Sequence, residues 1–524
     1  VFQLLLLSSM GSPYKFLVYN PQYWVSHMNF MSKLSDTLID AGHEVVMVSP
    51  RINTLIGSPK TKARVIELAQ SSSAITLQHR HNSKTGGFYE IWESNNVFAQ
   101  RMKLYPMLDV FASQCEATLA DLELIESLIH ENFEGAFTEH FDSCGYAIFH
   151  ILNIRKYATT VSFSIMDGLF SVLQVPLNTA YMPSQIGVTA GERMSFLDRV
   201  HNTLAHLFAD YFLKYFVAKY QTLVDRIMED PPNFEELMSN SSLVFINSDP
   251  LADFPKYTSP RVIDIGGITV HAGSNPLDQY WSSVLNLRNH TILISFGTFI
   301  KSHFMPDSYK ETIRQTARNF PNITFAWKYE KPEDNISLGI DNLIETTWAP
   351  QNDLLQDPRL TAFITHGGQG SILESAGAGV PLICIPIASD QPRNARQVER
   401  NGVGIMVNKG DLGRIGPLKE AIERIITDKS YKLNAVTLSN MIADRPFSMK
   451  DIFVRNMEFM VKYGPHERFQ HYGSQLNFFQ YYLIDVFAFL ALLVVGAIAI
   501  AFHSMYLVAN HFFGNAVLKK LKRH

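Results

Sequence analysis

Residues 348–391 constrain the chain more than any other stretch of its sequence. They contain the segments W-A-P-Q-N-D-L-L, T-H-G-G-Q-G-S-I-L-E and P-L-I-C-I-P-I-A-S-D-Q. One short stretch therefore carries an aromatic side chain, a His-Gly-Gly turn, an acidic residue and an Asp-Gln pair. These are the groups that could hold a base, a pyrophosphate, a ribose and a sugar in a single pocket.

The middle segment predicts a strand, a turn and a helix in succession. Residues 362–365 form an apolar run typical of a buried strand, His366-Gly367-Gly368 turns the chain, and residues 371–376 begin a helix. A helix N-terminus after a glycine turn offers free backbone N–H groups and its dipole to an anion, and glycine lets phosphates approach closely. A dinucleotide site is disfavoured because Leu373 stands where G-x-G-x-x-G needs its last glycine.

These three segments resemble the donor-binding signature of the UDP-glycosyltransferases, and of the animal UDP-glucuronosyltransferases in particular. The resemblance implies that Trp348 stacks on the uracil and that Gln351 contacts the base or ribose. It also implies that Glu374 accepts hydrogen bonds from the ribose, and that Asp390 and Gln391 hold the sugar hydroxyls. Each residue alone has an ordinary structural explanation, so the interpretation depends on their joint spacing.

The same resemblance implies a pyrophosphate site around the two glycine turns. Its expected residues are Ser295, Gly297 and Thr298 in the run I-L-I-S-F-G-T, together with His366, Gly367, Gly368, Gly370 and Ser371. Gln369 and Gly370 depart from the family, which usually carries Thr-Asn or Ser-Asn there. The lost asparagine would remove one hydrogen bond, worth roughly 1 kcal/mol, and would leave the backbone anion site in place.

Glycosyl transfer needs a base to take the acceptor proton, and His27 is the candidate. Ser26 is expected to cap a helix that runs to Ala41 and ends at Gly42. His27 would then lie in the first turn, where the helix dipole disfavours the imidazolium and keeps the neutral base available. The context Val-Ser-His after a strand also resembles the family's catalytic histidine.

The family pairs this histidine with an aspartate that follows a strand. Aligning Phe133 and Cys144-Gly145 with the family pattern places Glu139 at that position, one methylene longer than aspartate. Asp142 is a possible substitute. A carboxylate there would hold the histidine tautomer and stabilise the cation that forms.

The resemblance implies an inverting transfer of sugar from a UDP-sugar to a hydroxyl of a small lipophilic acceptor. No metal-ligand cluster is visible in the sequence, so neither a metal nor a cofactor is expected, and the UDP-sugar is a co-substrate. The alternative is a catalytically impaired UDP-sugar-binding membrane protein, suggested by the change from aspartate to Glu139. A UDP-sugar epimerase ranks last. The donor sugar, the acceptor and a homo-oligomer all stay open.

Apolar runs alternate with helical stretches in both halves, which predicts parallel sheets covered by helices. The chain has 524 residues, too many for one core. The expected fold class is α/β, of the GT-B type, with two Rossmann-like domains facing a cleft and one C-terminal transmembrane helix. The expected strands are 15–19, 44–49, 74–79, 135–138, 159–164, 292–296, 324–328, 343–346, 362–365, 381–386 and 404–407.

The expected domains follow from this pattern. They are a signal peptide remnant at 1–12, an acceptor-binding domain at 13–260, a UDP-sugar-binding domain at 261–450, helices leading back to the first domain at 451–485, a transmembrane helix at 486–508 and a basic cytoplasmic tail at 509–524. Residues 486–508 carry no Lys, Arg, Asp or Glu. At about 1.5 Å per residue they are long enough to cross a bilayer.

The termini and charges predict the location. The basic tail favours a single-pass type I protein of the endoplasmic reticulum membrane with a lumenal catalytic body, and Lys520 and Lys522 resemble a dilysine retrieval signal. A net charge of −4 without a basic stripe argues against nucleic acid as a partner. Three cysteines make no disulfide framework. Four sequons begin at Asn240, Asn289, Asn322 and Asn335.

Overall fold

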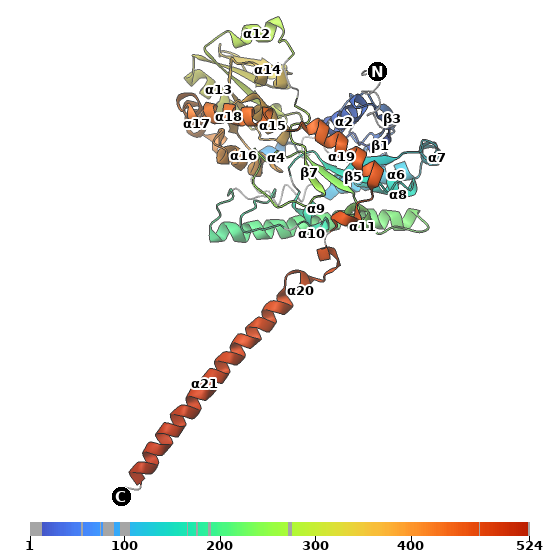
Figure 1. The fold of residues 1–524 in the computed structure, drawn as a ribbon. Helices are drawn as coiled ribbons and strands as arrows, with labels where there is room; N and C mark the ends of the chain where they lie inside the picture. The colour runs from blue at the N-terminus through green and yellow to red at the C-terminus, as the bar shows by residue number, and fades with distance from the viewer. Residues whose placement is uncertain are drawn as a thin grey trace, which may run out of the picture. The chain divides into compact units, whose positions relative to one another are not determined.

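The structure is a computed structural model that describes residues 13–521 except 54–55, 74, 77–87, 95–104, 165, 174, 176, 187–189, 271–274 and 471. The expected signal peptide remnant lies outside the described residues. The chain forms two compact units, Val1–Phe469 and Gln470–His524. The larger unit contains two parallel sheets with helices packed around them, and the smaller contains the long C-terminal helix (Figure 1).

The first sheet has seven parallel strands in the order β3-β2-β1-β4-β5-β6-β7. Its strands are β1 (Lys15–Tyr19), β2 (Glu44–Pro50), β3 (Arg64–Leu68), β4 (Gly135–Glu139), β5 (Tyr157–Val161), β6 (Leu243–Ile246) and β7 (Val262–Asp264). The strand order reverses between β1 and β4, which pair with Tyr19 opposite Thr138. Ligands in such folds bind beyond the carboxyl ends of strands at this reversal.

The second sheet has six parallel strands in the order β10-β9-β8-β11-β12-β13. Its strands are β8 (His290–Ser295), β9 (Ile323–Lys328), β10 (Leu343–Thr346), β11 (Leu360–Thr365), β12 (Leu382–Cys384) and β13 (Gly404–Met406). The order reverses between β8 and β11, where Ser295 lies opposite Thr365. The two glycine turns predicted to bind phosphate therefore leave neighbouring strands at the same edge.

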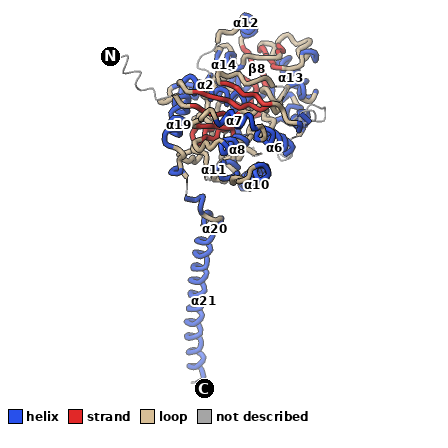
Figure 2. The backbone as a smooth tube through the Cα atoms, turned by 90° about the vertical axis from the view of Figure 1, so that its right-hand side faces the viewer, coloured by secondary structure: helices blue, strands red, loops and turns tan. Residues whose placement is uncertain are grey.

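Helices surround both sheets, and Figure 2 shows the strands inside the helical layers. The helices of the first half are α2 (Val25–Asp40), α4 (Phe88–Glu93), α6 (Tyr105–Leu119), α7 (Leu122–Ile129), α8 (Cys144–Ile151), α9 (Asp167–Val172), α10 (Phe196–Ile227) and α11 (Phe234–Ser239). Those of the second half are α12 (Gln279–Leu285), α13 (Asp307–Asn319), α14 (Gln351–Gln356), α15 (Gln369–Ala378), α16 (Gln391–Arg400), α17 (Ile415–Thr427), α18 (Ser430–Ala443) and α19 (Met449–Tyr463).

Helix α19 returns to the first sheet. Its Phe453 ring lies 6.0 Å from that of Phe137 on β4 and 4.9 Å from that of Phe245 on β6. Met457 and Met460 are fully buried in the same core. Burial of these apolar side chains holds the helix in place.

Three local expectations differ from the structure. The first sheet continues to Asp264, so a boundary at residue 260 would cut off β7. Ile75 and Thr76 lie in a helical turn rather than a strand, and the rest of the expected strand 74–79 lies outside the described residues. The edge strand is β3, whose residues R-V-I-E-L are exposed or half-buried. Trp24, not Ser26, is the N-cap of α2, and no side chain caps that helix.

A disulfide joins Cys115 on α6 to Cys144 at the start of α8. The two residues are separated by 29 positions in the sequence. Three cysteines without a recognisable spacing gave no sign of this pairing. The third, Cys384, is free and buried.

The smaller unit contains α20 (Phe478–Tyr481) and α21 (Ile484–Leu521). Within α21, Ile484–Phe513 is apolar, and an 18-residue window of it has a mean hydropathy of 2.7 with none of that window buried. It is long and apolar enough to cross a bilayer. The helix extends beyond both ends of the 486–508 segment expected from the sequence.

Candidate functional site

His27 and Glu139 meet because β1 and β4 are neighbours. His27 lies in the first turn of α2, which follows β1, and Glu139 is the last residue of β4. The His27 Nδ1 atom is 2.7 Å from Oε1 and 2.8 Å from Oε2 of this carboxylate. Adjacent parallel strands thus bring two distant residues to one sheet edge.

Two further residues, Ser162 and Tyr23, hold this pair. The backbone N–H of Ser162 donates to Glu139 Oε1 at 3.1 Å, and its Oγ lies 2.9 Å from His27 Nδ1. The Tyr23 hydroxyl donates to Glu139 Oε2 at 3.1 Å. Burial alone would raise the pKa of Glu139, but the charge and hydrogen bond of His27 lower it to about 2. The carboxylate is therefore ionised and fixes Nδ1, which leaves Nε2 as the nitrogen for a substrate.

Asp142 occupies a different position. It accepts hydrogen bonds from the Tyr220 hydroxyl at 2.7 Å, from the Cys144 N–H at 3.1 Å and from the Tyr19 hydroxyl at 3.3 Å. Its burial raises its pKa to about 6 although these bonds act in the opposite direction. Asp142 therefore anchors the start of α8, and Glu139 is the carboxylate that contacts His27.

Aromatic rings line the His27 side chain. The ring centroids of Trp24, Phe163 and Phe141 lie 4.9, 5.7 and 5.8 Å from that of His27. Phe299, in the loop after β8 of the second sheet, lies 5.6 Å from Trp24. This aromatic wall, formed by Trp24, Phe141, Phe163 and Phe299, can pack against an apolar molecule beside the histidine.

The His366 ring packs between Gly297 and Gly368, and it leaves no room for a side chain at either position. A Cβ atom on Gly297 would lie 2.8 Å from His366 Cε1, and one on Gly368 would lie 2.6 Å from Nε2. Gly297 also has a φ of 84°, in the left-handed region. Burial, with the charge of Lys328, lowers the pKa of His366 to about 4. The ring is therefore neutral at pH 7 and can donate one hydrogen bond.

The helix after this turn begins at Gln369 and not at Ser371, with Gly368 as its N-cap. Its first N–H groups have no partner within the helix and face the turn. Gly370 lies in this first turn with open space where a Cβ would be. The predicted anion site therefore starts two residues earlier than the apolar pattern indicated.

Gln351 and Glu374 lie together beside that turn. Gln351 Nε2 donates to Glu374 Oε2 at 2.5 Å and to Ser371 Oγ at 3.2 Å. Burial raises the pKa of Glu374, and the bond from Gln351 partly offsets this. The carboxylate is placed to accept hydrogen bonds, as a ribose-binding group must.

Asp390 and Gln391 are held at the start of α16. Gln391 Oε1 accepts the backbone N–H groups of Ile387 at 2.8 Å and Ala388 at 2.9 Å, so its amide NH₂ is directed elsewhere. Asn394 donates to Asp390 Oδ2 at 2.6 Å and to the Gly367 carbonyl at 3.1 Å. Asn394, which the sequence analysis did not identify, thus ties the Asp-Gln pair to the phosphate turn.

Lys328 is a second residue that the sequence analysis missed. It ends β9, and its Nζ donates to the Gly297 carbonyl at 2.7 Å and lies 5.9 Å from the Trp348 ring centroid. Trp348 itself is 64% exposed, so its ring is open to a ligand. Thr298 is also exposed, in the loop after β8. The Lys328 ammonium group thus lies between the Trp348 ring and the Gly297 turn, which is predicted to bind phosphate.

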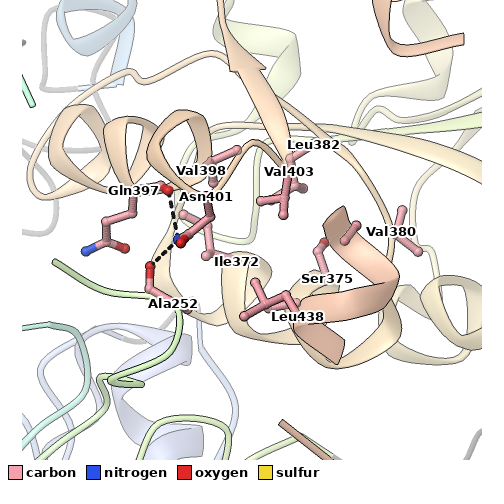
Figure 3. Close-up of a pocket in the computed structure, with 12 residues that line it drawn as sticks. Ala252, Ile372, Ser375, Val380, Leu382, Gln397, Val398, Asn401, Val403 and Leu438 are labelled. Carbon is pink, nitrogen blue, oxygen red and sulfur yellow. Dashed lines mark hydrogen bonds between the residues drawn. The ribbon is translucent and has the colours of Figure 1, made fainter. Parts of the chain in front are cut away.

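The predicted donor residues form one cluster, and the two sheets meet beside it. Gln369 Nε2 at the start of α15 donates to the Asn247 carbonyl after β6, at 3.0 Å. A separate small cavity lies between α15, α16 and α18, and Figure 3 shows its mainly apolar lining around Ile372, Val398 and Leu438. That cavity belongs to the core of the second domain. Among the described residues, no cluster of three His, Cys, Asp or Glu could hold a metal.

The chain is similar in sequence to known proteins. A family model described as "UDP-glucoronosyl and UDP-glucosyl transferase" matches residues 15–520. Human UDP-glucuronosyltransferase 1A10 is 29% identical over 488 residues, which cover 91% of this chain and 88% of the relative. The putative UDP-glucuronosyltransferase ugt-48 of Caenorhabditis elegans is 27% identical over 497 residues, 93% of each chain.

Solved structures show the same fold at low identity. The glycosyltransferase of kitacinnamycin matches with a TM-score of 0.59 and 15% identity, covering 88% of this chain and 100% of its own. Phytolacca americana UGT2, solved with UDP-2-fluoro-glucose and pterostilbene, matches with a TM-score of 0.55 and 14% identity, covering 86% and 100%. The GT-B fold class expected from the sequence is confirmed.

Proposed function

This chain belongs to the UDP-glucuronosyl and UDP-glucosyl transferase family, and we propose that it transfers a sugar with inversion to a hydroxyl of a small lipophilic acceptor. Family membership makes it an enzyme that takes the sugar from a UDP-sugar donor. The acceptor class, the inversion and the residue roles below are the proposal. The observation that carries it is the 2.7 Å contact between His27 Nδ1 and Glu139 Oε1.

In the proposed step, His27 Nε2 removes the proton from the acceptor hydroxyl. The acceptor oxygen forms a bond to the anomeric carbon as the bond from that carbon to the UDP oxygen breaks on the opposite face. Glu139 stabilises the imidazolium, because an ionised, buried carboxylate touches the opposite ring nitrogen. The proton ends on His27, and the bond pair leaves with UDP.

Fixed groups of the second domain would stabilise the negative charge that develops on UDP. His366 can donate a hydrogen bond, the first turn of α15 offers backbone N–H groups, and Lys328 adds a positive charge close by. Trp348 would stack on the uracil, and Gln351 with Glu374 would bind the ribose. Asp390 and Gln391 would hold the sugar.

The aromatic wall supports a lipophilic acceptor. Trp24, Phe141 and Phe163 surround the base, and partial exposure of the three rings leaves apolar surface for a ligand. An acceptor ring that packs there would remove apolar surface from water. Each Å² buried in this way would stabilise the complex by about 25 cal/mol. The hydroxyl of such a ring would then be presented to His27.

A catalytically impaired binding protein is the other reading of Glu139. That reading requires the longer carboxylate to miss the histidine. The contact distances of 2.7 and 2.8 Å instead show that glutamate reaches Nδ1. This geometry favours an active enzyme.

We also propose that the catalytic body lies in the lumen of the endoplasmic reticulum and that α21 spans its membrane. The Cys115–Cys144 disulfide favours an oxidising compartment. The four sequon asparagines are all exposed on the surface and open to glycosylation. Among the described residues, one helix long and apolar enough to span a membrane follows the body.

The test is a donor screen of the purified protein with several UDP-sugars and a simple phenol. We expect acceptor-dependent release of UDP and a glycoside whose anomeric configuration is opposite to that of the donor, read by NMR. A retained configuration would refute direct displacement, and UDP binding without transfer would favour the impaired protein. Unchanged activity in EDTA would support the prediction that no metal is needed.

A further inference from the structure

We propose that Arg393 is a positioning residue that couples the sugar-binding pair Asp390–Gln391 to the His27–Glu139 pair across the two domains. The inference rests on the proposed function. It concerns how the donor and the base are held in register, which the roles of the individual residues do not explain.

Arg393 belongs to the donor domain but makes its polar contacts in the other one. It lies in the first turn of α16, two residues after Gln391. Its Nη1 is 2.8 Å from Asp253 Oδ1 and 3.2 Å from Ser164 Oγ, and its Nε donates to the Pro183 carbonyl at 3.0 Å. All three partners precede β7, so they belong to the acceptor domain.

The ion pair with Asp253 is closed off from water. Both side chains are 1% exposed. Burial would raise the pKa of Asp253, but the charges of Arg393 and Lys256 lower it to about 2. Gln397 of α16 also donates to its Oδ1, at 2.5 Å. A buried ion pair of this kind adds little net stability over an apolar contact, yet its geometry is strict.

Ser164 carries the connection to the base. It is the third residue of the segment Ser162–Ser164, whose first residue touches His27 Nδ1 at 2.9 Å and whose second, Phe163, lies against the His27 ring. Arg393 binds the third residue. Three consecutive residues therefore connect the guanidinium that follows Asp390–Gln391 to the imidazole.

The planar guanidinium suits this task. Its several N–H donors lie in a fixed fork, so one side chain can bind Asp253, Ser164 and Pro183 together. A lysine ammonium is a single point on a flexible stem and cannot reproduce that arrangement. Small errors in register between reacting groups reduce rates strongly.

Helix α16 also offers a matched control. Arg400 at its other end forms an ion pair with Glu192 of the acceptor domain at 3.0 Å, with the two side chains 32% and 34% exposed. This pair joins the same helix to the same domain but reaches neither Asp390–Gln391 nor Ser162–Ser164. Removing it tests whether any bridge between the domains would have the same effect.

The experiment compares Arg393→Lys, Ser164→Ala and Arg400→Met in the full chain. The measurements are kcat for the glycoside, the ratio of glycoside formed to UDP released, UDP affinity by calorimetry, and Tm. We expect kcat to fall at least about tenfold in Arg393→Lys and at least about threefold in Ser164→Ala. The glycoside-to-UDP ratio should also fall, because a misaligned donor reacts with water, while UDP affinity stays within about twofold. Arg400→Met should match the wild type in kcat and in this ratio.

The outcomes separate the two proposals. If the wild type is active and both Arg393→Lys and Ser164→Ala keep its kcat and ratio per folded molecule, the coupling is refuted and the proposed function stands. An equal loss of kcat and of the glycoside-to-UDP ratio in Arg400→Met would also refute the coupling. Any contact between the two domains would then have the same effect as the Arg393 contacts. A wild type that binds UDP but transfers no sugar refutes the proposed function, and the coupling with it.

Discussion

The Nδ1 atom of His27 lies 2.7 Å from Oε1 of Glu139, although 112 positions separate the two residues in the sequence. The contact exists because β1 and β4 are adjacent and parallel and both end at the same sheet edge. It orients the imidazole so that Nε2 is the nitrogen that can accept a proton. Five predictions test this contact, the proposed donor site and the fold around them.

Replacing His27 with alanine should abolish transfer while UDP still binds. In the proposed mechanism this side chain supplies the base from the first domain, whereas the proposed donor residues lie in the second. General base catalysis raises the rate by about 100- to 10,000-fold, so kcat should fall by at least about 100-fold. Single-turnover kinetics and UDP calorimetry measure the two effects. Retained turnover would mean that another group takes the proton.

Glu139→Gln should lower kcat by about 100-fold or more, while Asp142→Asn should lower it far less. Glutamine keeps the size of the side chain but removes the charge that stabilises the imidazolium. Asp142 is bound by Tyr220 and Tyr19 instead. The reverse order of kcat values would assign the supporting role to Asp142.

Asp142 should also give the chain a recognisable pH dependence of stability. Its folded pKa of about 6 lies above its ordinary value of 3.8. The folded state therefore binds the proton more tightly, and this contribution is fully present below about pH 4 and is lost as pH rises through 6. The total corresponds to about 3 kcal/mol of unfolding free energy.

The wild type alone cannot isolate this effect, because His140 and His366 act in the opposite sense. Burial lowers the pKa of each to about 4, so stability from these histidines rises with pH up to about 6.5. The measurement is therefore the difference in urea unfolding free energy between Asp142→Asn and the wild type. That difference should move in favour of the variant as pH rises from about 4 to 7. A difference independent of pH would contradict the assignment.

Much of the proposed donor site could be read from the sequence because its residues are local. His366, Gly367 and Gly368 follow one strand directly, and a strand, a turn and a helix leave a readable pattern in order. Lys328 and Asn394 left no such pattern in the sequence. Each reaches the site from another element, and a lone lysine or asparagine has many ordinary roles.

The same contrast holds for the fold. The largely apolar strand Lys15–Tyr19 was predicted at its observed bounds. The edge strand Arg64–Leu68 was missed, since its charged and apolar residues are mixed without the regular alternation that marks a half-buried strand. The aromatic wall was not foreseen because Trp24 and Phe299 come from separate domains and meet only after folding.

Trp348→Ala should weaken UDP binding by about 5- to 150-fold, the range expected from base stacking on an aromatic side chain. Its ring is 64% exposed and therefore free to receive a base. Tyr280→Ala is the matched control, because Tyr280 is an exposed aromatic residue of the same domain, on α12. Calorimetry with UDP alone measures both. Equal Kd values for wild type and Trp348→Ala would remove this residue from the donor site.

Breaking the Cys115–Cys144 disulfide should destabilise the acceptor domain more than the donor domain. The bond closes a loop between α6 and α8 over 29 positions, and such a loop restricts the unfolded chain by about 3–4 kcal/mol. The Cys115→Ala, Cys144→Ala variant should therefore show faster hydrogen exchange in β4 and β5, while β11 and β12 exchange as in the wild type. Cys384→Ala is the control, since that thiol is free. Uniform exchange in all three proteins would mean that the bond adds no stability to the sheet that holds Glu139.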